Sequence, residues 1–213
     1  MELTNKQLAN KQLALHVLEK MELRGFKGYY CDNSKDVVTL LQTMLPEHAT
    51  VTFGGSETLK ECGVSELLKS DSYQFIDRTT AQTPDEAREI YAKMTMSDYF
   101  FMSANAITFD GQLVNIDGTG NRTAFLIHGP EHVVVIAGIN KLVDTLDMAI
   151  DRAKNAAAPP NAIRLNRQTP CKELGRCADC LTEDCMCCNT VITRRSYKKD
   201  RIIVILVNEE LGY

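Results

Sequence analysis

Between Ser103 and Lys141 the chain alternates short polar, glycine-bearing segments with runs of apolar, β-branched residues. The polar segments are Ser103–Asn105, Asp117–Arg122 and Gly138–Lys141, and each adjoins an apolar run with the composition of a buried strand. In open α/β sheets, ligands bind in the crevice outside the carboxyl ends of the strands, where backbone N–H groups and helix N-termini converge. The alternation therefore predicts an α/β fold with a ligand site made from strand ends.

The first hundred residues alternate between helical and extended patterns. Residues 4–24 carry an apolar face with helical spacing, Ser34 is a suitable N-cap for a helix ending near Met44, and Thr83-Pro84 is a strong helix start. Further runs predict a helix over 56–68 and strands over 26–31, 49–55, 72–77 and 99–104. Such an alternation favours a largely parallel sheet that is covered on both faces.

The second half begins with a hairpin signal and ends with a strand. Asp110-Gly111 lies inside the alternating run 107–116 and predicts a β-hairpin. Later patterns predict a helical turn at 122–128, a buried strand at 132–137, a long helix over 140–157 and a last strand over 201–208. Residues 159–196 are polar and cysteine-rich, which indicates an insertion within a single domain that spans 1–213. The predicted fold is three-layer α/β/α, with a mostly parallel, Rossmann-like sheet, the hairpin and this insertion before the last strand.

The length, net charge and apolar content of the chain exclude some classes of function. A chain of 213 residues buries roughly 70% of its unfolded surface when it folds, so its core needs no disulfides. A formal charge of −4 and a pI of about 5.6 argue against a nucleic acid or an anionic membrane as the main partner. No apolar run approaches the roughly 20 residues that a membrane helix needs, and the N-terminus lacks the apolar core of a signal peptide. We therefore expect a soluble, cytoplasmic protein.

Gly54, Gly55 and Ser56 follow a predicted strand and precede a predicted helix. Two glycines at such a turn let backbone N–H groups point into one concavity, which is a suitable place for an anion. The hydroxyl of Ser56 or Thr58 would add a further donor. The alternative is a tight turn with an ordinary helix cap, in which Thr58 and Glu61 form a capping box.

The three polar segments between residues 103 and 141 supply the other candidate ligand-binding groups. Arg122 is suited to hold a carboxylate or a phosphate through two parallel hydrogen bonds, which a lysine cannot do equally well. The candidate set, with the glycine turn included, is Gly54, Gly55, Ser56, Thr58, Asn105, Asp117, Gly118, Gly120, Asn121, Arg122, Asn140 and Lys141. The alternative makes Asp117 a turn former, Arg122 a surface ion-pair member, Asn140 a helix N-cap and Lys141 a solvated helix residue.

Six of the eight cysteines fall between residues 171 and 188. The Cys177-x-x-Cys180 spacing lets two thiolates bind one metal ion, and further cysteines bracket this pair. We predict a metal site at Cys171, Cys177, Cys180 and Cys187, a ligand set that suits zinc or an iron–sulfur cluster. The alternatives are free thiols or disulfides. The two remaining cysteines, Cys31 and Cys62, are expected to be buried small hydrophobic residues.

The run from 103 to 141, the earlier GGSETLKECG (54–63) and the closing ILVNEELGY together resemble the LUD-domain (lactate utilisation) proteins over nearly the whole chain. The resemblance implies the fold of ribose-phosphate isomerases, glucosamine-phosphate deaminases and CoA transferases, in which the turn matching Gly54–Ser56 often holds an anion. SANAI and GTGNR stand where the isomerases carry DGADE and KGGGG, and neither Glu57 nor Glu131 has the setting of the CoA-transferase nucleophile. The resemblance therefore implies the fold of these enzymes but not the reactions that they catalyse.

The resemblance also implies a role in bacterial lactate utilisation, as an accessory or redox-partner component beside an iron–sulfur protein. The alternative is a free-standing enzyme that acts on a phosphorylated sugar, a CoA ester or another anionic metabolite, and the sequence leaves open whether the chain is an enzyme. A metal- or redox-sensing regulator is a third hypothesis. In each case we expect an anionic small molecule as ligand and no nucleic acid or membrane partner, with homo-oligomers left open.

Overall fold

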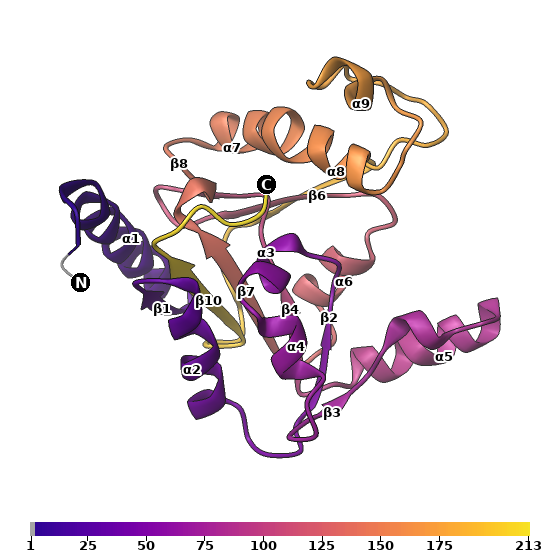
Figure 1. Ribbon diagram of the computed structural model, residues 1–213, viewed down its shortest axis with the longest axis horizontal. Helices are drawn as coiled ribbons and strands as arrows, with labels where there is room; N and C mark the ends of the chain where they lie inside the picture. The colour runs from indigo at the N-terminus through magenta and orange to yellow at the C-terminus, as the bar shows by residue number, and fades with distance from the viewer. Residues whose placement is uncertain (1–2) are drawn as a thin grey trace.

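The most apolar runs of the chain form one six-stranded sheet in the computed structural model, which describes residues 3–213 (Figure 1). Its strands are β1 (Lys27–Cys31), β2 (Thr50–Phe53), β3 (Gln74–Phe75), β4 (Tyr99–Met102), β7 (His132–Gly138) and β10 (Ile202–Val207). They lie in the order β1-β10-β7-β4-β2-β3, and every neighbouring pair is parallel. The predicted α/β fold with a mostly parallel sheet is thus confirmed.

Helices cover both faces of this sheet, because alternate residues of each buried strand point to opposite sides. In β10, Ile202 and Leu206 face one hydrophobic core, whereas Ile203 and Val207 face the other. The first core is closed by α1 (Asn5–Leu23), α5 (Pro84–Thr95) and α6 (Asn121–Ile127). The second is closed by α2 (Ser34–Met44), α3 (Glu57–Glu61) and α4 (Val64–Leu68). Both faces of the sheet are therefore buried beneath helices, which explains why these strands are nearly continuous apolar runs.

A second, four-stranded sheet stands beside the first. Its strands are β5 (Ala106–Thr108), β6 (Leu113–Asp117), β8 (Leu142–Val143) and β9 (Asn189–Thr193), in the order β8-β5-β6-β9. The predicted hairpin at Asp110-Gly111 joins β5 to β6, with Gly111 at φ 85°. The strand β9 pairs antiparallel with β6, so part of the 159–196 stretch completes this sheet. Sequence analysis did not predict that pairing, because only alternate residues of β9 are partly buried.

Helix boundaries differ from the prediction in three places. The N-cap of α2 is Asn33, whose side chain accepts from the N–H groups of Lys35 and Asp36, and Ser34 is the first residue of the helix. The run 56–68 is two helices, because Gly63 adopts a left-handed conformation (φ 69°) between α3 and α4. The predicted helix over 140–157 is wrong at both ends. Helix α7 (Leu146–Arg152) begins only after Thr145, and the chain continues helically through a π-helical turn, Ala153–Ala157, into α8 (Ala158–Arg164). Pro159 and Pro160 lie in the first turn of α8, where a missing N–H costs little.

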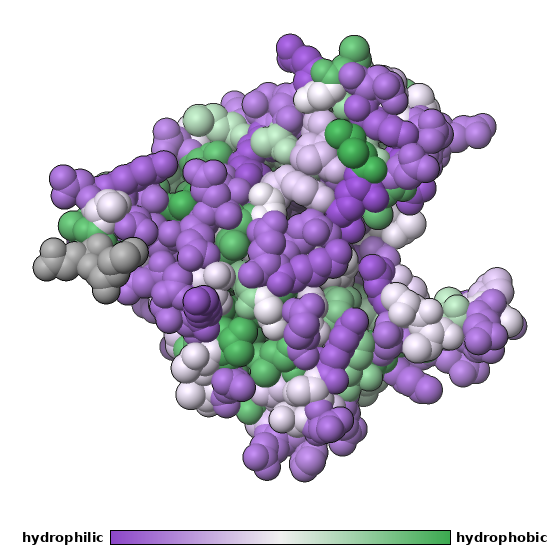
Figure 2. Space-filling view, in the orientation of Figure 1, coloured by the Kyte–Doolittle hydropathy of each residue, from purple (hydrophilic) through white to green (hydrophobic). Residues whose placement is uncertain are grey.

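The upper layer of Figure 1 consists of α7, α8 and α9 (Pro170–Leu174), above the carboxyl ends of the central strands. The last residues of the chain run between this layer and α3. Figure 2 shows a mostly hydrophilic face that is indented on the right, between the upper helices and α5. Within residues 3–213, no helix is both long and apolar enough to cross a membrane.

Candidate ligand-binding cleft

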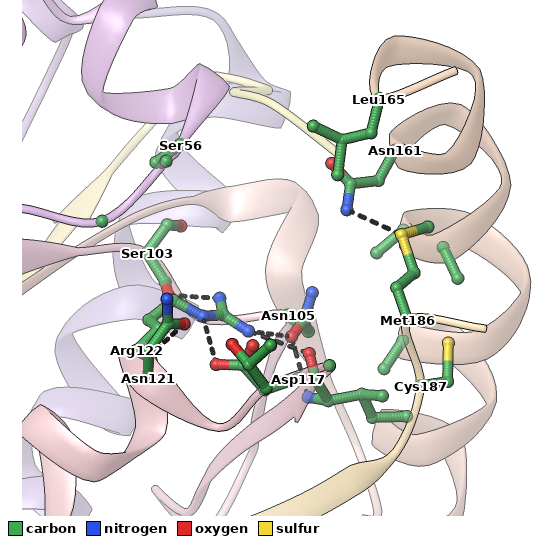
Figure 3. Close-up of a pocket in the computed structure, with 18 of the residues that line it drawn as sticks. Ser56, Ser103, Asn105, Asp117, Asn121, Arg122, Asn161, Leu165, Met186 and Cys187 are labelled. Atoms are coloured by element: carbon green, nitrogen blue, oxygen red, sulfur yellow. Dashed lines mark hydrogen bonds and ion pairs between the residues drawn. The ribbon is translucent and has the colours of Figure 1, made fainter. Parts of the chain in front are cut away.

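A cleft of about 590 Å³ lies at the carboxyl ends of β2, β4 and β6, beneath α8. One wall is the Gly54–Thr58 turn together with the start of α6, and the other is α8 with the cysteine-bearing segment 183–188. Figure 3 shows the two walls facing each other, with Ser56, Ser103, Asn105, Asp117 and Arg122 opposite Asn161, Leu165, Met186 and Cys187. The cleft is thus at the place where the polar segments of the sequence predicted a ligand site.

The guanidinium of Arg122 lies at the base of the cleft and is bonded mainly to the protein itself. Its Nε donates to Asp117 Oδ2 at 3.3 Å, and its Nη2 donates to Asn105 Oδ1 at 3.0 Å and to the carbonyl of Ile116 at 2.9 Å. Its Nη1 donates to the carbonyl of Ser103 at 3.3 Å. Burial lowers the pKa of Arg122, and the adjacent Asp117 carboxylate opposes that shift. Arg122 therefore joins the ends of β4 and β6 and leaves little of its donor capacity for a ligand.

Other predicted ligand-binding residues near Arg122 make hydrogen bonds that stabilise the 117–122 turn. Asp117 Oδ2 accepts from the backbone N–H of Thr123 at 3.2 Å, and Gly120 caps α6 at φ 77°. The carbonyl of Gly118 accepts from Asn189 Nδ2 at 2.8 Å. Asn121 Nδ2 donates to the Tyr91 hydroxyl at 2.7 Å. Within residues 3–213, the Nδ2 group of Asn105, a residue of the cleft lining, has no hydrogen-bond acceptor.

Arg122→Ala should lower the free energy of unfolding by about 3 kcal/mol, because it leaves the mostly buried carboxylate of Asp117 without its cation. Urea denaturation measures this loss. Arg167→Ala is the matched control, since Arg167 also lines the cleft but pairs with Asp184 at a side-chain exposure of 46%; it should cost under about 1 kcal/mol. Equal effects of the two substitutions would contradict a structural role for Arg122.

The Gly54–Thr58 turn presents backbone donors to the cleft. An added Cβ at Gly54 would lie 3.4 Å from Phe100 Cζ and 3.5 Å from Arg122 Cγ, which is ordinary van der Waals contact. Ser56 Oγ accepts from the Leu59 N–H at 3.3 Å and caps α3, so the alternative capping box of Thr58 with Glu61 is wrong. The N–H groups of Gly55 and Ser56 have no hydrogen-bond acceptor within the described part of the chain.

The C-terminal segment Leu211–Tyr213 covers the other end of this turn. Thr58 Oγ1 donates to the Leu211 carbonyl at 3.3 Å, and the Gly212 N–H donates to Glu61 Oε2 at 2.6 Å. A Cβ at Gly212, where φ is 55°, would lie 2.6 Å from Thr58 Oγ1, so only glycine fits. Asn140 binds this segment through Leu211 and Gly212 instead of lining the cleft or capping a helix.

Lys141 is buried, and its amine is hydrogen-bonded to the main chain of the last residue of the sequence. The residue is only 3% exposed, and its Nζ donates to the main-chain oxygen of Tyr213 at 2.7 Å. Within residues 3–213, no Asp or Glu side chain forms an ion pair with it. Burial, with the nearby charges of Arg152 and Arg122, lowers the pKa of Lys141 to about 7, and Glu61 opposes the shift. Lys141 is therefore a buried residue in the cleft lining with a lowered pKa, not a solvated helix residue.

Because the folded-state pKa of Lys141 is about 7, the effect of Lys141→Met on the free energy of unfolding should depend on pH. Below that pKa both states bind the proton, and the cost of burying the charge is constant. Between about pH 7 and pH 10 only the unfolded state binds it, so the free energy of unfolding of the native protein rises by about 1.4 kcal/mol per pH unit from this group. The native-minus-variant difference in urea unfolding should rise with that slope from about pH 7 to pH 9. A constant difference would show that Lys141 remains charged.

Sequence analysis missed Arg78, which follows β3 in a short 3₁₀ helix, Arg78–Thr80. Its Nη2 lies 3.4 Å from the position that a Cβ of Gly55 would take, and it lines the cleft. Within the described residues it makes no ion pair or side-chain hydrogen bond. The sequence contained a signal for it, because Arg78 directly follows the predicted strand 72–77. Arg164 in α8, also missed, pairs with Glu57 across the cleft at 3.5 Å.

The cysteine-rich segment forms part of the upper wall. The residues that line the cleft there include Cys185, Cys187 and Cys188. Cys185 Sγ accepts from the Cys187 N–H at 3.4 Å. Burial, and then the neighbouring thiols of Cys185, Cys177, Cys171 and Cys180, raise the pKa of Cys187 to about 12. No three His, Cys, Asp or Glu side chains within residues 3–213 are arranged to hold a metal ion, so the metal site stays a prediction.

The two other cysteines behave as predicted. Cys31 and Cys62 are both 4% exposed and belong to the core between the sheet and α2–α4. Burial raises the pKa of Cys31 to about 11 and that of Cys62 to about 12. Both thiols are therefore small core residues, far from being reactive.

The sequence model of the LUD domain matches residues 15–207, and the chain belongs to that family. Among solved structures, a DUF162 family protein from Deinococcus radiodurans matches with a TM-score of 0.53 and 8% identity, over 98% of this chain and 100% of that one. At this identity the likeness shows the fold alone. The structure of eIF2B delta from Chaetomium thermophilum is similar over 57% of this chain and 54% of its own, at 14% identity and a TM-score of 0.36, which supports no argument. A search of curated protein sequences gives no match.

Proposed function

We propose that this LUD-family protein binds a small anionic metabolite in the cleft and serves in lactate utilisation. The observation that carries the proposal is the charge of the cleft lining. Three lining cations have an acidic partner, in the pairs Arg122–Asp117, Arg164–Glu57 and Arg167–Asp184. Arg78 makes no ion pair within residues 3–213, and among the lining carboxylates there Glu183 also makes none. An anion that enters the cleft would therefore meet donors that the protein has not already used.

The size of the cleft favours a metabolite over a macromolecule. Its 590 Å³ falls within the range of about 300–1,000 Å³ that is typical of small-molecule sites. The guanidinium of Arg78 can hold a carboxylate or a phosphate with two hydrogen bonds. The N–H groups of Gly55 and Ser56 and the Nδ2 group of Asn105 add uncharged donors. This combination is suited to a small molecule with one anionic group and further polar atoms.

Arg78→Ala should weaken ligand binding at least about tenfold, because it removes a charged donor worth about 1.5–3 kcal/mol. Isothermal titration with lactate, pyruvate and ribose 5-phosphate measures the change. Arg88→Ala is the matched control, since Arg88 is an exposed arginine of α5 outside the cleft lining. Both variants should keep the native melting temperature. No binding of any of the three compounds to the native protein would contradict the proposal.

The role in lactate utilisation is supported by the family and is tested separately. We propose an accessory or redox-partner component that works beside an iron–sulfur protein. A strain that lacks the protein should consume lactate more slowly, and an iron–sulfur protein should co-purify with the tagged chain. Normal lactate consumption, with ligand binding intact, would instead favour a free-standing enzyme that acts on another anionic metabolite.

A metal centre in the upper wall is the second candidate, and it follows from the gathering of thiols. The ionisable neighbours of Cys187 include Cys185, Cys177, Cys171 and Cys180, although none is arranged around a common centre with two others. Thiolates are the preferred donors for zinc and iron–sulfur clusters. We propose that Cys171, Cys177, Cys180 and Cys187 close around a metal when it binds, since metal binding and folding of such segments are coupled.

Metal analysis of protein purified without oxygen tests this second candidate. Brown protein with iron and sulfide would make the chain an electron-transfer component, whereas colourless protein with one zinc would make the centre structural. Cys177→Ser should lose most of the metal in either case. Cys188→Ser is the matched control, because Cys188 is exposed and outside the proposed ligand set; it should keep the metal. Protein without metal, or equal losses in the two variants, would contradict the ligand set.

A further inference from the structure

We propose that the outer edge of β9 pairs with the same edge of a second copy of this chain, so that the two four-stranded sheets form one continuous sheet. β9 is the last strand in the order β8-β5-β6-β9, and β6 is its only strand partner within residues 3–213. Addition of a strand to an open sheet edge is a common mode of protein recognition. The inference goes beyond the proposed function, because it assigns an interaction surface and does not depend on what the cleft binds.

The hydrogen bonds of β6 show which of its residues bond toward β9. In an antiparallel ladder, the N–H and C=O groups of successive residues point alternately to the two sides of a strand. The N–H of Ile116 donates to Asn105 Oδ1 at 2.9 Å, on the side of β5. The carbonyl of the next residue, Asp117, accepts from the Cys188 N–H at 3.0 Å, on the side of β9. Asn115 and Asp117 therefore bond toward β9.

The same alternation leaves two residues of β9 with outward backbone groups. Val191 lies opposite Asn115, so its N–H and C=O groups point inward, to β6. The N–H and C=O groups of its neighbours Thr190 and Ile192 therefore point away from β6. Within residues 3–213, these groups have no backbone hydrogen-bond partner. β9 thus presents two donors and two acceptors along its outer edge.

β9 lacks the features that usually keep an edge strand from pairing. Natural edges are protected by charged residues, by proline or by being very short. The opposite edge strand, β8, has only two residues, and β1, at an edge of the other sheet, begins with Lys27. β9 has five residues, Asn-Thr-Val-Ile-Thr, with neither a charge nor a proline. Thr190 is exposed and Ile192 is 41% exposed, although β-branched residues favour strand pairing.

Both ends of β9 are held by the rest of the protein. At its start, Asn189 Nδ2 donates to the carbonyl of Gly118 at 2.8 Å. Just after its end, Arg24 Nη1 donates to the Arg194 carbonyl at 2.9 Å, and the Ser196 N–H donates to the Arg24 carbonyl at 2.8 Å. The edge is therefore ordered before a partner strand arrives, which lowers the entropic cost of pairing.

The charges beside β9 favour a second copy that runs in the antiparallel direction. Glu183 and Asp184 precede the strand, whereas the exposed Arg194 and Arg195 follow it. Within residues 3–213, neither of these arginines forms an ion pair. Antiparallel pairing places the arginines of each copy at the end where the acids of the other copy lie, whereas parallel pairing would place like charges together. Because one surface pairs with itself, the assembly closes as a two-fold dimer.

One register uses all the outward groups of both copies. With the two-fold axis at Val191, Thr190 of each copy lies opposite Ile192 of the other, and the two residues exchange both N–H···O bonds. Each Ile192 side chain then packs against a Thr190 side chain across the strands. The two Val191 residues form a non-hydrogen-bonded pair, with Cα atoms about 4.5 Å apart.

The dimer would also affect the cleft. The cysteine-bearing segment 183–188, which forms part of the upper wall, leads directly into β9. A strand held between β6 and a second copy cannot shift without breaking hydrogen bonds on both sides. Pairing would therefore restrict the movement of this wall in both copies.

Analytical ultracentrifugation of the full chain tests the inference. We expect the native protein to sediment as a dimer, at twice the chain mass of 23.8 kDa. Thr190→Pro removes an N–H that points away from β6, so the melting temperature should be unchanged while the dissociation constant of the dimer rises at least about tenfold. Thr190→Ala keeps that N–H and is the matched control, with a change of under about threefold. A native protein that stays monomeric, or a dimer that Thr190→Pro leaves intact, would overturn the inference.

Two cysteine variants test the register without proline. On incubation with oxidised glutathione, which takes up two electrons and leaves as two molecules of glutathione, Val191→Cys should form a disulfide between copies, because Cα atoms about 4.5 Å apart are within disulfide range. Ile192→Cys is the matched control. It is the more exposed position, but its two Cα atoms would be about 8 Å apart, which is too far. Non-reducing electrophoresis and peptide mapping separate the new bridge from bridges of the native cysteines. Equal bridging at both positions, or none at either, would overturn the inference.

Discussion

The position of the Arg122 guanidinium is the constraint on which the cleft depends. Its hydrogen bonds reach the end of β4 at Ser103, the start of β5 at Asn105 and the end of β6 at Ile116 and Asp117. These are the points where the six-stranded and the four-stranded sheets come together. One planar group with five N–H donors can bind several carbonyl and carboxylate oxygens at once. Arg122 thereby fixes the relative position of the two sheets, and the cleft is the space that remains above it.

Within the wall formed by the Gly54–Thr58 turn and the start of α6, one part has hydrogen-bonded polar atoms and another part has donors that are free among residues 3–213. Around Arg122, most polar atoms already have partners within the protein. At the Gly54–Thr58 turn, the N–H groups of Gly55 and Ser56, the guanidinium of Arg78 and the amine of Lys141 retain donor capacity within the described residues. Since unsatisfied donors in a partly dry site favour an anion, the chemistry of the cleft belongs to the turn and the C-terminal segment. The glycine-rich loop at 117–122 supports that site from below.

Much of the fold could be predicted because its signals are local. The buried strands have continuous apolar runs, Thr83-Pro84 starts α5, and Asp110-Gly111 forms the hairpin, each from residues close in sequence. The errors arise where distant segments decide the outcome. Pro159 and Pro160 suggested a helix end, yet a π-helical turn before them lets the chain continue helically. The pairing of β9 with β6 joins residues that are far apart in the sequence, from Asp117 with Asn189 to Leu113 with Thr193, which no local pattern specifies.

For the site, the sequence by itself determined which chemical groups stand at strand ends, namely the glycine turn at 54–56 and the polar segments between 103 and 141. It did so because strand ends are fixed by apolar runs and turn residues of short range. It also determined that six cysteines fall between residues 171 and 188. Only the tertiary structure decided their roles. Arg122 connects the two sheets because its guanidinium donates to acceptors from different segments, namely the Ser103 carbonyl, Asn105 Oδ1 and the Ile116 carbonyl. Lys141 became a buried amine with a lowered pKa because the C-terminal segment closes over it and two arginines lie near it, and burial and Coulomb interactions depend on distances in space.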